Sequence, residues 1–115
     1  MIVLVCGGRD YRDDILMVKT LDKINHGWPI TKLIHGGANG ADELAGVWAK
    51  SKAIRVQEFR ANWTRYGKAA GPMRNQRMID EGQPKMVVAF PGGSGTADMI
   101  SRAEKAGVPV VRIEP

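Results

Sequence analysis

The fold of this chain is decided by residues 86–96, Met86-Val87-Val88-Ala89-Phe90-Pro91-Gly92-Gly93-Ser94-Gly95-Thr96. Five apolar residues in a row are typical of a strand that is covered on both faces of a parallel sheet. The glycines that follow let the backbone turn sharply, and the hydroxyl residues suit the start of a helix. A strand, a short loop and a helix in this order indicate an α/β fold.

Two more strand-like runs lead into glycine-rich loops in the same way. Ile2–Cys6 precedes Gly7-Gly8-Arg9-Asp10, and Lys32–His35 precedes Gly36-Gly37-Ala38-Asn39-Gly40-Ala41-Asp42. If the three runs are parallel strands of one sheet, all three loops emerge at its carboxyl edge. Open α/β sheets bind ligands at that edge, so the loops predict a crevice for a phosphate group or a nucleotide.

The rest of the chain alternates between helix and strand signals. Helices are expected over about residues 14–25, 38–52, 72–81 and 95–106, and strands over 54–59 and 108–113, while residues 60–70 show no clear period. Right-handed crossovers leave few topologies for this order, and the most common one for five strands is 3-2-1-4-5. We therefore expect one Rossmann-like domain, residues 1–115, with a parallel sheet and helices on both faces.

Apolar spacing indicates which side chains fill the interior. In the first expected helix, four apolar residues recur three apart and are expected to form the inward face: Ile15, Val18, Leu21 and Ile24. Trp28 and Trp48 are expected to pack in the core. Trp63 and Tyr66, in the segment without a period, are able instead to stack on a base.

The composition is that of an ordinary globular domain. Of the 115 residues, 43% are hydrophobic and 25% charged, so the chain can bury a core without disulfides. The single cysteine, Cys6, is expected to be a buried thiol in a reducing cytoplasm. We see no export signal and no apolar stretch near the roughly 20 residues of a membrane helix, so we expect a cytoplasmic protein without a membrane partner. The net charge of +5 suits an anionic ligand.

The loop at residues 91–96 is the first candidate for ligand binding. Successive N–H groups at a helix start form a cradle for an anion, and the hydroxyls of Ser94 and Thr96 can donate to phosphate oxygens. The alternative is a plain turn in which Thr96 only caps the helix. Neither a Walker loop nor the common dinucleotide-binding Gly-x-Gly-x-x-Gly is present. In the three loops, the candidate ligand-binding residues are Gly7, Gly8, Arg9, Asp10, Gly36, Gly37, Ala38, Asn39, Gly40, Asp42, Pro91, Gly92, Gly93, Ser94, Gly95 and Thr96.

Polar side chains near these loops each have two interpretations. Asp42 lies in the first turn of a helix, where it either balances the helix dipole or contacts a ribose hydroxyl. His35 ends a strand without a cysteine or carboxylate cluster, so we expect a hydrogen-bonded structural residue and no metal site. Arg74 and Arg77 share a face near a helix start, where their charges oppose the dipole. Such a placement favours a bound anion, and two solvated arginines are the alternative.

Four ordered motifs together resemble the SLOG superfamily, and most closely its small YspA-like branch. The motifs are Gly7-Gly8-Arg9-Asp10-Tyr11, His35-Gly36-Gly37-Ala38-Asn39-Gly40-Ala41-Asp42, Gly71-Pro72-Met73-Arg74-Asn75 and Pro91-Gly92-Gly93-Ser94-Gly95-Thr96. The resemblance implies a Rossmann-like domain that binds nucleotides or nucleotide-derived ligands, such as NAD fragments or ADP-ribose-like molecules. It also adds Arg74 and Asn75 to the ligand-binding residues.

The cytokinin-activating phosphoribohydrolases are a related family that cleaves the base–ribose bond of nucleoside monophosphates. Their pattern pairs a helical arginine, which Arg74 matches, with Pro-Gly-Gly-x-Gly-Thr-x-x-Glu. Met99 stands at the glutamate position, and Asp98 lies one residue earlier, turned by about 100° around the helix. If the chain is a hydrolase of this kind, Arg74 and Asp98 are the catalytic candidates, with Asp10 or Asp42 as other replacements for the glutamate.

The expected partner is thus a small nucleotide-type ligand, with no additional cofactor required. N-glycosidic or phosphoribosyl hydrolysis of nucleoside monophosphates or NAD-like molecules is the first alternative. Single-stranded nucleic-acid binding is the second, supported by the basic charge and by similarity of the fold to DNA-processing proteins of the same superfamily. The shallow crevice of so small a domain is also compatible with a homo-oligomer.

Overall fold

The continuous apolar runs lie side by side at the centre of one sheet. The computed structural model describes residues 1–115, and its five strands are all parallel, in the order β3-β2-β1-β4-β5. The strands are β1 (Ile2–Cys6), β2 (Lys32–His35), β3 (Arg55–Glu58), β4 (Met86–Ala89) and β5 (Val110–Arg112). The predicted fold class and strand order are confirmed.

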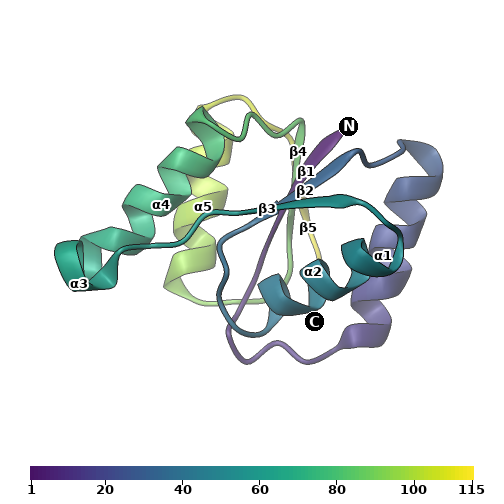
Figure 1. Cartoon of the computed structure of the whole chain (residues 1–115), viewed down its shortest axis with the longest axis horizontal. Coiled ribbons are helices and arrows are strands. Elements are labelled where there is room, and N and C mark those ends of the chain that lie inside the picture. Colours follow the sequence, from purple (N-terminus) through teal and green to yellow (C-terminus); the bar gives the residue numbers. More distant parts are fainter.

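Helices cover both faces of this sheet (Figure 1). α1 (Asp14–Gly27) and α2 (Ala41–Ser51) lie on one face, and α4 (Ala70–Asp80) and α5 (Ser94–Lys105) lie on the other. α3 (Trp63–Tyr66) and a 3-10 turn, η1 (Gly67–Ala69), precede α4 and extend beyond the sheet. The strand order reverses between β1 and β4, and sheets of this type bind ligands at that point.

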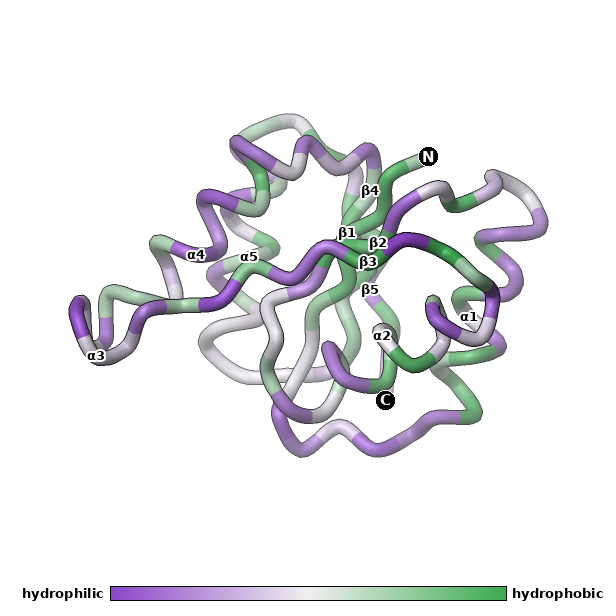
Figure 2. The backbone as a smooth tube through the Cα atoms, in the orientation of Figure 1, coloured by the Kyte–Doolittle hydropathy of each residue, from purple (hydrophilic) through white to green (hydrophobic).

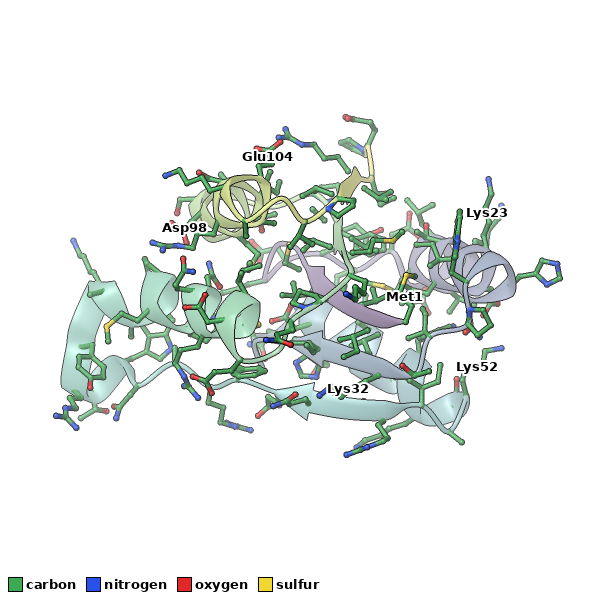
Figure 3. All side chains as sticks on the ribbon, turned by 90° about the horizontal axis from the view of Figure 1, so that it is seen from above. Met1, Lys23, Lys32, Lys52, Asp98 and Glu104 are labelled. Carbon is green, nitrogen blue, oxygen red and sulfur yellow. The ribbon has the colours of Figure 1, made fainter.

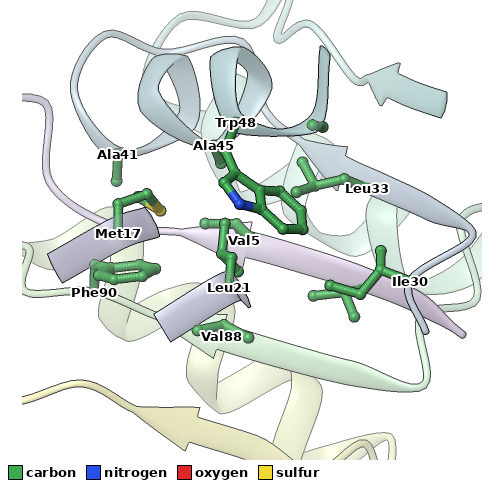
Figure 4. Close-up of a cluster of buried hydrophobic side chains, with 12 residues drawn as sticks. Val5, Met17, Leu21, Ile30, Leu33, Ala41, Ala45, Trp48, Val88 and Phe90 are labelled. Carbon is green, nitrogen blue, oxygen red and sulfur yellow. The ribbon is translucent and has the colours of Figure 1, made fainter. Parts of the chain in front are cut away.

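Successive residues of the central strands alternate between two cores because strand side chains point to opposite faces. The core under α1 and α2 is drawn in Figure 4 and contains Val3, Val5, Met17, Leu21, Ile30, Leu33, Ala41, Ala45, Trp48, Ala49, Val88 and Phe90. The core under α4 and α5 contains Leu4, Cys6, Ile34, Phe59, Met78, Ile79, Val87, Ala89, Met99 and Ala103. Figure 2 shows the same arrangement, with hydrophobic strands in the middle and long hydrophilic stretches in the surrounding helices and loops.

The inward face of α1 differs from the expected one. Leu21 and Met17 are fully buried, but Ile15 is 71% exposed and Val18 is 41% exposed. Residues three apart step around a helix by about 300°, so a run of them drifts by about 60° per step. With Leu21 against the sheet, Ile15 is turned away by about 120°, and Met17, four residues before Leu21, takes the inward position.

Trp28 and the segment before α4 also differ from expectation, whereas Trp48 is buried as predicted. Trp28 is 63% exposed: it follows the last turn of α1 in an extended conformation, and its N–H donates to the carbonyl of Ile24. Residues 63–69, which belong to the segment without a clear period, form α3 and η1. The side chain of Asn62 caps α3 by accepting from the N–H of Arg65 at 3.1 Å. A helix of this length is too short to show an apolar period.

A glycine at the start of α2 supports the carboxyl edge of the sheet. Gly40 has φ +75°, and a β-carbon there would overlap the backbone carbonyls of Gly8 and Arg9. We expect Gly40→Ala to lower the free energy of unfolding by about 2–5 kcal/mol, from the left-handed backbone and the clash together.

Gly107 provides the matched control, because it has φ +76° but nothing within 4 Å of an added β-carbon. Gly107→Ala should therefore lower the free energy of unfolding by only about 1–2 kcal/mol. Urea denaturation of the two variants measures the difference, and equal losses would show that the contact at Gly40 is unimportant.

Candidate functional site

Gly8 ties the three glycine-rich loops together at the carboxyl edge of the sheet. Its N–H donates to the carbonyl of Pro91 at 2.8 Å, and its own carbonyl accepts from the N–H groups of Tyr11 at 3.2 Å and Ala41 at 3.1 Å. A β-carbon at position 8 would lie 3.0 Å from the carbonyl oxygen of Pro91 and 3.2 Å from the α-carbon of Gly92. The loops after β1, β2 and β4 therefore meet at one rim, as the sequence predicts.

An open crevice of about 670 Å³ lies at this rim, beside the N-terminal parts of α4 and α5. Most of the predicted site residues line it, namely Gly7, Gly8, Arg9, Gly36, Ala38, Asp42, Arg74, Asn75, Gly93, Ser94, Gly95, Thr96 and Asp98. Gly37 and Asn39 line a smaller hollow that adjoins the crevice. The predicted residues that line neither space are Asp10, Gly40, Pro91 and Gly92.

The loop after β4 brings unpaired N–H groups to the crevice. The first backbone hydrogen bond of α5 runs from the N–H of Ala97 to the carbonyl of Gly93. The N–H groups of Ser94, Gly95 and Thr96 therefore have no acceptor within the chain. Gly93 is the N-cap, and Thr96 is a buried residue one turn into the helix rather than its cap. Free N–H groups at the positive end of a helix dipole are suited to an anion.

The loop after β2 uses three of its N–H groups, those of Gly36, Gly37 and Ala38, within the chain. Oδ2 of Asp42 accepts from the N–H groups of Gly36 and Ala38, each at 3.1 Å, and Nδ1 of His35 accepts from Gly37 at 2.9 Å. Burial raises the pKa of the Asp42 carboxyl, and the N–H of Ala38 counters part of that rise. Asp42 thus braces the loop, and His35 is a hydrogen-bonded structural residue, as the sequence predicts.

Arg74 joins the ends of two strands. Its Nη1 donates to the carbonyl of Gly36, beyond β2, at 2.5 Å and to the carbonyl of Phe59, beyond β3, at 3.5 Å. Its Nε donates to Oδ1 of Asn75 at 3.1 Å. These acceptors explain how a guanidinium group is tolerated near the start of α4, where the helix dipole opposes it. Nη2 has no acceptor within the chain, so it is the part of Arg74 that is available to a ligand.

Asp98 lies on α5, on the side that faces α4 (Figure 3). Its Oδ2 accepts from Nδ2 of Asn75 at 3.0 Å and from Nε of Arg102 at 2.8 Å. Burial alone would raise the pKa of this carboxyl, but the bonds from Arg102 and Asn75 outweigh it, so the pKa lies below its usual value. Asp98 is therefore ionised at neutral pH. Met99, at the glutamate position of the phosphoribohydrolase pattern, is 1% exposed and belongs to the core.

Sequence reasoning found only part of the wall of the crevice that comes from η1 and α4: Arg74 and Asn75 were predicted as site residues and line it. Lys68, Gly71 and Pro72 also line the crevice and were not among the predicted site residues. Trp63, predicted to stack on a base, lines the crevice and the smaller hollow and packs on Gly71. The guanidinium carbon of Arg9 lies 5.6 Å from the ring centroid of Trp63. For the three missed residues only the Gly71-Pro72 pair offered a signal, because the segment that contains Lys68 has no apolar period.

Three further observations concern the thiol of Cys6, clusters of metal-ligating side chains, and helices that could span a membrane. Cys6 lines the crevice but is 8% exposed, and burial raises its pKa to about 12, so it is not a thiolate nucleophile at neutral pH. No three His, Cys, Asp or Glu side chains gather as metal ligands. None of the helices combines the length and the apolarity that crossing a bilayer requires.

Comparison with known proteins agrees with this architecture. Gene 61 protein of Mycobacterium phage D29 is 36% identical over 117 aligned positions, which cover 95% of this chain and 93% of that protein. The X-ray structure of DNA processing protein A (DprA) from Streptococcus pneumoniae superimposes with a TM-score of 0.72 at 20% sequence identity. That superposition covers 98% of this chain but 50% of DprA, so the chain spans half the length of that relative and shares its fold.

The family model for the YspA, cpYpsA-related SLOG family (YAcAr) matches residues 1–66. The chain therefore belongs to this family, and the resemblance stated from the motifs is confirmed.

His35 predicts how the stability of the rim depends on pH. Burial lowers the pKa of His35 from its ordinary value of 6.5, so the unfolded chain binds a proton at a higher pH than the folded chain does. The free energy of unfolding should therefore fall as the pH drops below 6.5, by at most about 1.4 kcal/mol per pH unit. Protonation also removes the acceptor of the Gly37 N–H.

Urea denaturation between about pH 5.5 and 7.5 measures this dependence, which spans the titration of a histidine. His35→Asn keeps an acceptor near the Nδ1 position without titrating, and it should flatten the profile. His26→Gln, at the exposed histidine of α1, is the control and should keep the wild-type slope. A wild-type slope in His35→Asn would contradict the assignment.

Proposed function

We propose that the chain binds a nucleotide or a nucleotide-derived ligand in the crevice, with a phosphate group at the N-terminus of α5. The observation that carries the proposal is the set of unpaired N–H groups of Ser94, Gly95 and Thr96, which line the crevice at the positive end of a helix. Each of these groups needs an acceptor, and the chain supplies none.

The charge and size of the crevice support the same ligand class. Arg9, Lys68 and Arg74 line it and bring positive charge to a rim where a phosphate would sit. Its volume of about 670 Å³ falls in the range of roughly 300–1,000 Å³ that is usual for pockets of small ligands. Trp63, which is 47% exposed, offers an aromatic surface for a base.

The comparisons are consistent with two sources of the nucleotide: a free nucleotide, or one within a strand of nucleic acid. The solved neighbour is named a DNA processing protein, and each nucleotide of a DNA strand presents the same phosphate and base as a free nucleotide. Single-stranded nucleic acid therefore remains an alternative source of the ligand.

Thermal denaturation with AMP, ADP-ribose and NAD tests the proposal. At a concentration ten times the Kd, a ligand should add about 1.4 kcal/mol of stability, or roughly 5 °C in Tm. Gly95→Leu should abolish the shift, because an added β-carbon at Gly95 meets no protein atom within 4 Å and the side chain can fill the crevice.

Ala97→Leu is the matched control, since it enlarges an exposed position of the same helix outside the crevice. It should leave the ligand-induced shift unchanged. The absence of a shift with all three ligands, at concentrations up to several millimolar, would refute nucleotide binding in this crevice.

Asp98 favours a second candidate function, hydrolysis of the base–ribose bond. Its ionised carboxylate lines the same crevice, where it can stabilise the positive charge that develops on the ribose and orient the attacking water. The other candidates are less suited: Asp42 is 6% exposed and burial raises the pKa of its carboxyl, Asp10 lines neither space, and Met99 is apolar and buried.

Chromatography of AMP incubated with the protein tests this second function. If hydrolysis occurs, adenine is released, and Asp98→Asn should slow the release by about 100-fold or more, because the charge is lost while the shape is kept. Glu104→Gln changes a carboxylate of the same helix that instead pairs with Arg112 at 3.4 Å, and should have no effect. Wild-type activity in Asp98→Asn would exclude Asp98 as the catalytic carboxylate.

A further inference from the structure

A smaller hollow of about 290 Å³ adjoins the crevice on the side of α3 and the loop after β2. Arg9, Trp63 and Arg74 line both spaces, so they form the boundary between them. Arg60 and Asn39 line the hollow and not the crevice. A ligand whose phosphate lies at α5 can therefore continue past Trp63 into a second space.

The smaller hollow concentrates positive charge. Arg9, Arg60 and Arg74 all line it, and of the three only Arg60 has an ion-pair partner, Glu58. Arg60 nevertheless keeps 80% of its side chain exposed. Burial lowers the pKa of Arg74; the nearby carboxylate of Asp42 opposes this shift, and the charge of Arg9 adds to it, as expected for two neighbouring cations. Like charges gathered around one small space favour an anion between them.

Trp63 gives the boundary an aromatic surface. It is held on one side by contact with Gly71, where a β-carbon would lie 3.0 Å from the indole ring. It is 47% exposed, and the guanidinium carbon of Arg9 lies 5.6 Å from its ring centroid. Aromatic rings combined with basic side chains bind nucleotides by stacking on the base and neutralising the phosphates.

Resting on the proposed function, we infer that the ligand is a dinucleotide, that is, two nucleosides joined through phosphate. One phosphate lies at the free N–H groups of α5, one base stacks on Trp63, and the negative charge of the linkage or of the second nucleotide reaches the hollow formed by Arg9, Arg60 and Arg74. Two nucleosides joined through phosphate occur in small molecules with a pyrophosphate linkage. They also occur in single-stranded nucleic acid, where the linkage is a phosphodiester.

Isothermal titration calorimetry with AMP, NAD and the dinucleotide pApA tests the inference. NAD carries the pyrophosphate linkage and pApA the phosphodiester linkage, and AMP carries one nucleoside. We expect NAD or pApA to bind about tenfold more tightly than AMP, since a further charged hydrogen bond is added. The tighter of the two identifies the source of the ligand.

Arg60→Gln separates the hollow from the crevice. This substitution should raise the Kd for the preferred dinucleotide about tenfold and change the Kd for AMP by no more than about twofold. Arg55→Gln is the matched control, because Arg55 is an exposed arginine of β3 that lines neither space. It should change neither affinity.

Tryptophan fluorescence gives an independent measurement of stacking. The dinucleotide should quench the emission of the wild-type chain, and Trp63→Phe should lose that response. Trp28→Phe should keep it, because Trp28 follows the C-terminal end of α1 and lines neither space.

The outcomes distinguish this inference from the proposed function. If AMP binds as tightly as NAD and pApA, or if Arg60→Gln leaves dinucleotide binding unchanged, the second subsite is wrong and nucleotide binding in the crevice stands. If none of the three ligands binds, both proposals fail.

Discussion

The site depends on the backbone of Gly8, because its hydrogen bonds join three loops at the carboxyl edge of the sheet. Its N–H and carbonyl connect the loop after β1 to Pro91 beyond β4 and to Ala41 at the start of α2. The approach is too close for a side chain, and Gly40 meets the same backbone from the other side. Because these contacts are between backbones, the rim has a defined shape whatever the exposed side chains do.

The loops after β2 and β4 look alike in sequence but differ in what they offer a ligand. A backbone N–H binds an anion only if the chain itself leaves it unpaired. After β2, Asp42 and His35 accept from the N–H groups of Gly36, Gly37 and Ala38. After β4, no side chain accepts from Gly95 or its neighbours, and Ser94 and Gly95 are exposed, so water can serve their N–H groups until an anion replaces it.

One helical step on α5 separates an apolar core residue from a carboxylate. Both residues line the crevice, but Met99 is buried against the sheet, while Asp98, turned by about 100°, is partly exposed and is held by Asn75 and Arg102. A carboxylate is thus retained at the crevice although the glutamate of the phosphoribohydrolase pattern is replaced. The same network ties α4 to α5, so Asn75 links Arg74 on one wall with Asp98 on the other.

The order of elements, the strand order and the meeting of the loops could all be read from the chain, because strand burial repeats every two residues and crossovers have one hand. The continuous apolar runs marked β1 and β4 as central, because a strand that is covered on both faces has apolar residues at successive positions. Local pattern was insufficient where a residue's role depends on distant partners. The exposure of Ile15 follows from how α1 is rotated against the sheet. The bonds of Arg74 to Gly36 and Phe59, and the pairing of loop N–H groups, join residues far apart in the chain, and folding alone brings them within hydrogen-bond distance.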